Sequence, residues 1–121
     1  MTTKLDRENR VALAVQFARL CPHIKASEIS GDIETLGRLG ARLVRHEERM
    51  CSCADYYNAH TAEDGSNPIG ERIEARAAKI AAKYGAKINA QGDPRGYCLY
   101  IVRDGLRGNT WGGDEHGFGV N

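Results

Sequence analysis

The longest regular feature of the chain is a helical run of apolar residues between Ser27 and Cys51. Its apolar positions recur at intervals close to seven residues and are Ile29, Ile33, Leu36, Leu39, Leu43 and Met50. Residues spaced three and four apart share one face of an α-helix, so the pattern predicts a long helix over 28–51. Ser27 or Ser30 can cap its first turn, where two carboxylates also suit the helix dipole.

Small residues gather in the middle of this predicted helix, at Gly37, Gly40 and Ala41. Each glycine costs about 1 kcal/mol relative to alanine in a helix interior. Small side chains let a second backbone approach closely, so these positions indicate where another element, or a second copy of the chain, can pack. The sequence is compatible with a monomer or a homodimer.

Two further helices are predicted, over 6–20 and 68–84, separated from the long helix by Pro22 and by a polar stretch. The first carries a broad apolar stripe that consists of Val11, Leu13, Val15, Phe17 and Leu20, with Ala14 and Ala18. The second opens with Asn67 as N-cap and Pro68 at the first helical position. The stretch 52–67 has no useful periodicity, which predicts a loop long enough to be functional.

The periodicity changes from helical to extended after Gly85. Alternating and β-branched residues predict three strands, over 86–91, 97–103 and 106–111. The sequence GDPRG joins the first two strands and an Asp-Gly pair joins the last two, and both are turn signals. The expected fold is one α+β domain over 1–121, with three helices packed on a C-terminal three-stranded antiparallel meander.

Composition excludes several classes of protein. With 41% apolar and 27% charged residues the chain is typical of a soluble globular domain, and a net charge of +1 gives no global field that would attract nucleic acid. No window approaches the roughly 20 apolar residues that span a bilayer, and the start has no signal-peptide pattern. We therefore expect a cytoplasmic protein without a membrane partner, in which all four cysteines stay reduced.

The predicted meander brings distant polar residues to one end of the sheet, because its first turn and the end of its third strand lie together. The residues expected to converge there are Asp93, Arg95, Trp111, Asp114, Glu115 and His116. They could hold the C-terminal tail by ion pairs, which are usually weak at loop ends. They could instead anchor a protein partner through Arg95 and Trp111, or bind a divalent metal for acid–base chemistry.

A row of arginines on the long predicted helix is a second candidate site. Arg38, Arg42, Arg45 and Arg49 fall at helical spacing and could follow the phosphates of a nucleic acid. Glu47 and Glu48 interrupt this basic field, so a solvated helix face is the simpler interpretation.

Zinc binding is a weaker alternative, at the end of the same helix. The candidate ligands are His46, Cys51, Cys53 and His60, two imidazoles and two thiols. Zinc sites usually separate neighbouring cysteines by two to four residues, whereas one residue separates Cys51 from Cys53. A packed thiol and a solvated histidine explain these residues as well, and no cofactor is expected.

The C-terminal sequences GDPRGYCLYI and NTWGGDEHGFGV resemble those of small proteins encoded by tailed phages and prophages of Proteobacteria. The resemblance covers about the last forty residues and carries over nine motif positions without a known role. These are Asp93, Pro94, Arg95, Gly96, Asn109, Thr110, Trp111, Gly112 and Gly113. His116 stands where the pattern leads us to expect a second tryptophan.

A phage origin implies a class of function. Small phage proteins without catalytic motifs often bind a host macromolecule, for which a surface of about 800 Å² suffices. The sequence thus predicts a non-enzymatic inhibitor of a bacterial host protein or ribonucleoprotein complex, such as a CRISPR effector, acting by steric occlusion. The alternatives are a nucleic-acid-binding accessory protein that uses the arginine row and a small metal-dependent enzyme at the sheet end.

Overall fold

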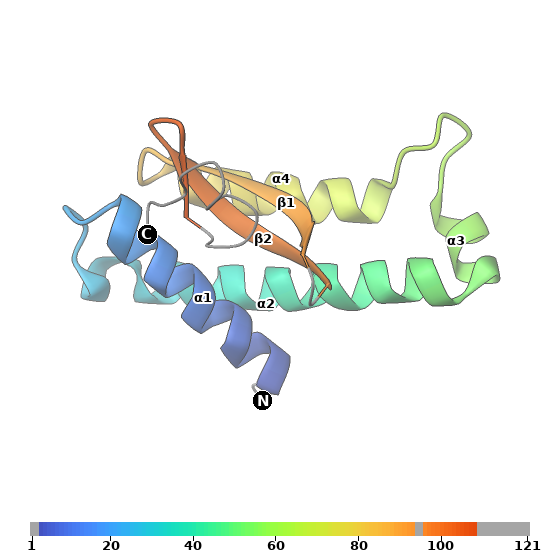
Figure 1. Ribbon diagram of the computed structural model, residues 1–121, viewed down its shortest axis with the longest axis horizontal. Helices are drawn as coiled ribbons and strands as arrows, with labels where there is room; N and C mark the ends of the chain where they lie inside the picture. The colour runs from blue at the N-terminus through green and yellow to red at the C-terminus, as the bar shows by residue number, and fades with distance from the viewer. Residues whose placement is uncertain (1–2, 94–95, 109–121) are drawn as a thin grey trace.

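The computed structural model describes residues 3–93 and 96–108 (Figure 1). The described chain forms four helices and a three-stranded antiparallel sheet, which confirms the α+β class. The elements are α1 Lys4–Leu20, α2 Ala26–Ser52, α3 Ala54–His60, α4 Pro68–Ala82, β1 Lys87–Asp93, β2 Gly96–Arg103 and β3 Leu106–Arg107. Within the described residues, no helix is long and apolar enough to cross a membrane.

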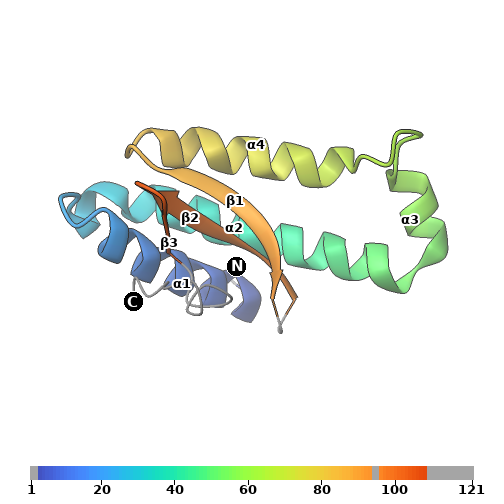
Figure 2. The same ribbon diagram turned by 45° about the horizontal axis from the view of Figure 1, so that its top comes forward.

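Helix α2 is the longest element and packs against α1, α3, α4 and β2. Its 27 residues confirm the long helix expected from the apolar repeat, and Ile29, Ile33, Leu36, Leu39 and Leu43 are all buried. The sheet lies over α2, with α1 beside β2 and α4 beside β1 (Figure 2). The hydrophobic core therefore lies between α2 and the sheet and is closed by α1 and α4.

Helix α1 crosses α2 at the two glycines (Figure 1). A Cβ atom on Gly37 would lie 2.9 Å from the Cβ of Arg10 and 3.0 Å from its backbone. A Cβ atom on Gly40 would lie 2.5 Å from the Oδ1 atom of Asn9. The glycines are thus explained by a close helix crossing inside one chain.

The sheet has the predicted meander order, β1-β2-β3. Ile88 pairs with Ile101, and both are buried against the helices. The hairpin between β2 and β3 turns at Asp104 and Gly105, whose φ angles are 53° and 80°. Positive φ at both central residues is what the Asp-Gly signal predicts, so this turn is confirmed.

The central strand, β2, is attached to α1 by a buried glutamine, and the residue after β3 bonds to the same position of β2. Gly108 donates its backbone N–H to the Ile101 carbonyl at 2.7 Å, while the Gln16 Oε1 atom accepts the Ile101 N–H at 2.8 Å. Strand β3 is described over Leu106–Arg107, and the remainder of the strand predicted over 106–111 lies mostly outside the described residues.

The loop predicted over 52–67 contains a fourth helix, which the sequence analysis missed. Cys53 is both the C-cap of α2 and the N-cap of α3, so the chain changes direction at a single residue. Helix α3 has no buried residue of its own, and Tyr56 holds it against α2. A seven-residue helix that depends on such contacts leaves no apolar repeat in its sequence.

Candidate functional site

Of the six residues predicted to converge at the end of the sheet, the structure describes only the backbone of Asp93. Asp93 is the last residue of β1 and pairs with Gly96, the first residue of β2, while the centre of the predicted GDPRG turn, 94–95, lies outside the described residues. The structure does not describe the side chain of Asp93. The other members of the cluster lie outside the described residues, and they are Arg95, Trp111, Asp114, Glu115 and His116. Their convergence stays a prediction.

The arginine row is exposed along α2, but three of its four members are engaged within the chain. Arg45 lies 3.7 Å from the Asp6 carboxylate and donates to the Thr3 hydroxyl at 2.9 Å. Arg49 stacks over the Tyr56 ring at 4.3 Å, and Arg38 donates to a threonine hydroxyl at 3.4 Å. Arg45 and Arg49 thereby connect the row to α1 and α3, and the Asp6 carboxylate partly neutralises the charge of Arg45.

The four zinc candidates do not form a ligand set. His46 is buried, and its Nδ1 and Nε2 atoms both lie 2.8 Å from protein partners, the Tyr56 hydroxyl and Asn67 Oδ1. The two cysteines, Cys51 and Cys53, are exposed, and the ring centroids of His46 and His60 are 6.2 Å apart. No group of three or more His, Cys, Asp or Glu residues suited to a metal occurs in the described part of the chain.

Instead, His46 is the centre of a hydrogen-bond network between α2, α3 and α4. Asn67 Oδ1 caps α4 by accepting the Gly70 N–H, and Asn67 Nδ2 donates to Glu47. Since Asn67 Oδ1 is an acceptor, the Nε2 atom of His46 donates to it, and the Nδ1 atom of His46 pairs with the Tyr56 hydroxyl. The network satisfies its own polar groups, which is typical of a structural role.

Glu74 on α4 is held close to other carboxylates. Burial raises its pKa above the ordinary value, and the negative charges of Glu47 and Glu71 raise it further. Asn67 donates to Glu47, but no hydrogen bond or ion pair within the described residues involves the Glu74 carboxylate. Its charge therefore opposes folding at neutral pH.

Helix α1 exposes apolar side chains to the solvent on one of its sides. Leu13, Phe17 and Leu20 are buried, whereas Val11 and Val15 are 57% and 50% exposed. Ala14 and Ala18 are exposed as well, and the four positions follow the spacing of one helix face. We call this surface the α1 outer face, defined by Val11, Ala14, Val15 and Ala18.

The α1 outer face corrects the expectation of one packed stripe over 6–20. Successive helical residues are separated by about 100°, so positions 13, 17 and 20 share one side and positions 11, 15 and 18 another. Treating every apolar residue as part of a single broad stripe concealed the second face. Counting the two faces separately would have found it in the sequence.

Comparison with protein-family models, with curated proteins and with solved structures finds no match to this chain. The fold and the exposed residues together define an α+β domain in which the apolar α1 outer face lies at the surface.

Proposed function

We propose that this protein is a non-enzymatic binding protein whose α1 outer face docks on a protein partner. The observation that carries the proposal is the exposure of Val11 and Val15 on one side of a helix whose other side is in the core. Full burial of a valine side chain stabilises a complex by about 1.5 kcal/mol or more. An amphipathic helix that lays such residues into an apolar groove is a recurring mode of protein recognition.

The chemistry of this face favours a protein over a nucleic acid. Valine and alanine offer no charge to a phosphate backbone, whose recognition depends on lysine and arginine. The resemblance to small phage-encoded proteins supports a partner in a bacterial host complex, with a defence complex such as a CRISPR effector as our first candidate. Occlusion of that partner's working surface, in the host cytoplasm, is the proposed mechanism.

Nucleic-acid binding through the arginine row is the second candidate. It is supported by the exposure of Arg38, Arg42, Arg45 and Arg49 along a single helix. It predicts an affinity that falls steeply with salt, because each neutralised phosphate releases counterions. The metal-dependent enzyme at the sheet end predicts a bound ion that is lost on Asp114→Ala.

The proposal is tested by capturing partners from bacterial lysate with tagged protein. The α1 variant is Val11→Lys/Val15→Lys, which places two charges on the α1 outer face. Its matched control is Ala75→Lys/Ala78→Lys, which places the same charges at exposed positions of α4. A third variant, Arg95→Ala/Trp111→Ala, tests the sheet end.

We expect wild-type protein and the α4 control to retain the same specific host protein, and the α1 variant to lose it. Loss in the sheet-end variant as well would extend the interface to that end. If the α1 variant, shown to be folded by circular dichroism, captures as much as wild type, the proposed surface is wrong. Nuclease-sensitive capture alone would favour the arginine row.

A further inference from the structure

Helix α4 exposes a row of basic side chains, on the flank of the sheet opposite α1 (Figure 2). The row repeats at intervals of four, three and four residues, and every member is exposed. Successive helical residues are separated by about 100°, so the row stays within about 60° of the helix circumference. We call it the α4 basic row, defined by Arg72, Arg76, Lys79 and the C-cap residue Lys83.

The charges on α4 are separated by sign. Glu71 and Glu74 lie on other sides of the helix, and the positions four residues after them are Ala75 and Ala78. Neither carboxylate is therefore three or four residues from a basic side chain, the spacing at which opposite charges stabilise a helix. The basic residues are instead spaced three and four apart from one another, which destabilises a helix whose charges are only solvated.

Most of the α4 basic row has no partner in the chain. The side chains of Arg72, Arg76 and Lys79 take part in no hydrogen bond or ion pair within the described residues. Lys83 differs, since its Nζ atom lies 2.9 Å from the Asp32 carboxylate. On α2, by contrast, three of the four arginines contact groups of the same chain. Three side chains of α4 can thus reach a ligand without breaking a contact.

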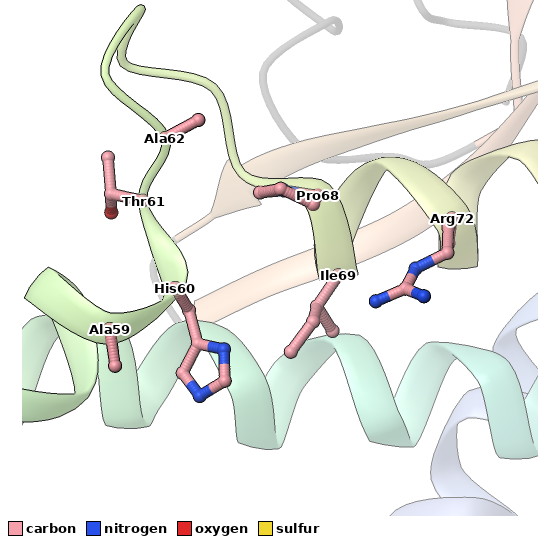
Figure 3. A pocket seen from close by; sticks show the side chains of 7 residues that line it. All are labelled: Ala59, His60, Thr61, Ala62, Pro68, Ile69 and Arg72. Atoms are coloured by element: carbon pink, nitrogen blue, oxygen red, sulfur yellow. The ribbon is translucent and has the colours of Figure 1, made fainter.

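The surface around the α4 basic row is neutral and low. Figure 3 shows the Arg72 side chain extending from α4 beside Ile69, with the His60 ring on the other side of Ile69. The residues that line this hollow include no carboxylate. Further along the helix, exposed alanines at positions 75, 78 and 82 accompany the row. No large side chain there keeps an extended anion away from the helix.

We propose that the α4 basic row binds the phosphate backbone of duplex DNA, without preference for sequence. The row is about 16 Å long, and one strand of the duplex carries a phosphate every 3.4 Å along its axis, so each cation can meet one. The row lies on a different helix from the α1 outer face, so DNA and a protein partner can bind together.

The composition of α4 favours a duplex over other polyanions. Single strands are bound largely by stacking their bases on aromatic side chains, and α4 has none. A helix that lies on an anionic membrane inserts large apolar side chains, whereas the isoleucines of α4 pack in or against the core. Paired bases need neither feature, because a duplex presents its phosphates outward.

Binding is tested by fluorescence anisotropy with the full-length protein and a labelled duplex of about 20 base pairs and mixed sequence. We expect saturable binding with a dissociation constant of about 10⁻⁵ M in about 50 mM salt, weakened about 50-fold in about 200 mM salt. That fall corresponds to about three neutralised phosphates. Absence of binding, binding insensitive to salt, or tighter binding to the single strand or to phosphatidylserine vesicles would overturn the proposal.

Three variants locate the surface. Arg76→Gln/Lys79→Gln should weaken binding about tenfold or more and lower the salt dependence by about two phosphates. Arg76→Lys/Lys79→Arg, which keeps both charges, should bind like the wild type. Arg38→Gln/Arg42→Gln, which removes two exposed charges from α2, is the matched control and should also bind like the wild type. Equal loss in the α2 control, or loss in the charge-conserving variant, would contradict the assignment to α4.

Discussion

At the scale of single residues, His46 connects the end of α2 to α3 and to the start of α4. Its ring joins Tyr56 of α3 to Asn67, the N-cap of α4, from a buried position on α2. A buried polar group contributes little net free energy when it is paired, but its removal leaves the partners unpaired. The stability of the α2–α3–α4 junction should therefore depend on this one ring.

We predict that His46→Leu lowers the free energy of unfolding by about 2–3 kcal/mol, because Tyr56 and Asn67 each lose a buried partner. Tyr56→Phe, which removes one of the two hydrogen bonds, should cost about 1 kcal/mol. Urea unfolding at neutral pH measures both. A His46→Leu protein as stable as wild type would show that the network carries no stability.

Glu74 gives a prediction with the opposite sign. Since its folded pKa is raised, the ionised side chain destabilises the fold at neutral pH, and Glu74→Gln should raise the free energy of unfolding by about 0.5 kcal/mol. The gain should disappear as the pH falls below 4.5, the ordinary glutamate pKa, because Glu74 is then protonated in both the folded and the unfolded state. Glu63→Gln, in the exposed turn before α4, is the control and should change little. A gain that persists in acid would refute this explanation.

At the scale of elements, the close crossing of α1 over α2 depends on Gly37 and Gly40, which have no side chain to separate the two helices. Alanine is the better helix former, by about 1 kcal/mol over glycine. At Gly37 that gain is opposed by contacts of 2.9–3.0 Å with Arg10, part of them backbone atoms that cannot move aside. At Gly31, in the same helix, a Cβ atom would meet nothing within 4 Å.

Gly37 and Gly31 should therefore respond in opposite directions to substitution by alanine. We predict that Gly37→Ala destabilises the protein by about 1–3 kcal/mol through overpacking. Gly31→Ala should stabilise it by about 0.5–1 kcal/mol. Thermal unfolding of the two variants side by side measures the difference, and stabilisation by both would mean that the helices do not cross as described.

The elements with strong local signals were predictable from the sequence. The apolar repeat gave α2, Asn67 and Pro68 marked the start of α4, and the Asp-Gly pair marked the last hairpin. Helix α3 was not predictable, because its packing depends on the partner that Tyr56 finds ten residues earlier in the chain. The His46 network was missed for the same reason, since sequence spacing does not reveal hydrogen bonds between separate helices.

At the scale of the whole molecule, α2 supports every other layer and leaves α1 at the surface (Figure 2). One side of α1 completes the core, so the other side is free to present Val11 and Val15. Helix α4 closes the opposite flank of the sheet and exposes alanines in place of valines. The two flanks thus provide an internal comparison for any binding experiment.

Photo-crosslinking from α1 is the most direct test of the proposed binding surface. A p-benzoylphenylalanine placed at position 15, in a bacterial cell that contains the partner, should form a covalent adduct with the host protein captured by the wild type. The same group at position 78 of α4, which is also exposed, should not. Adducts from position 78 but not from position 15 would contradict the account.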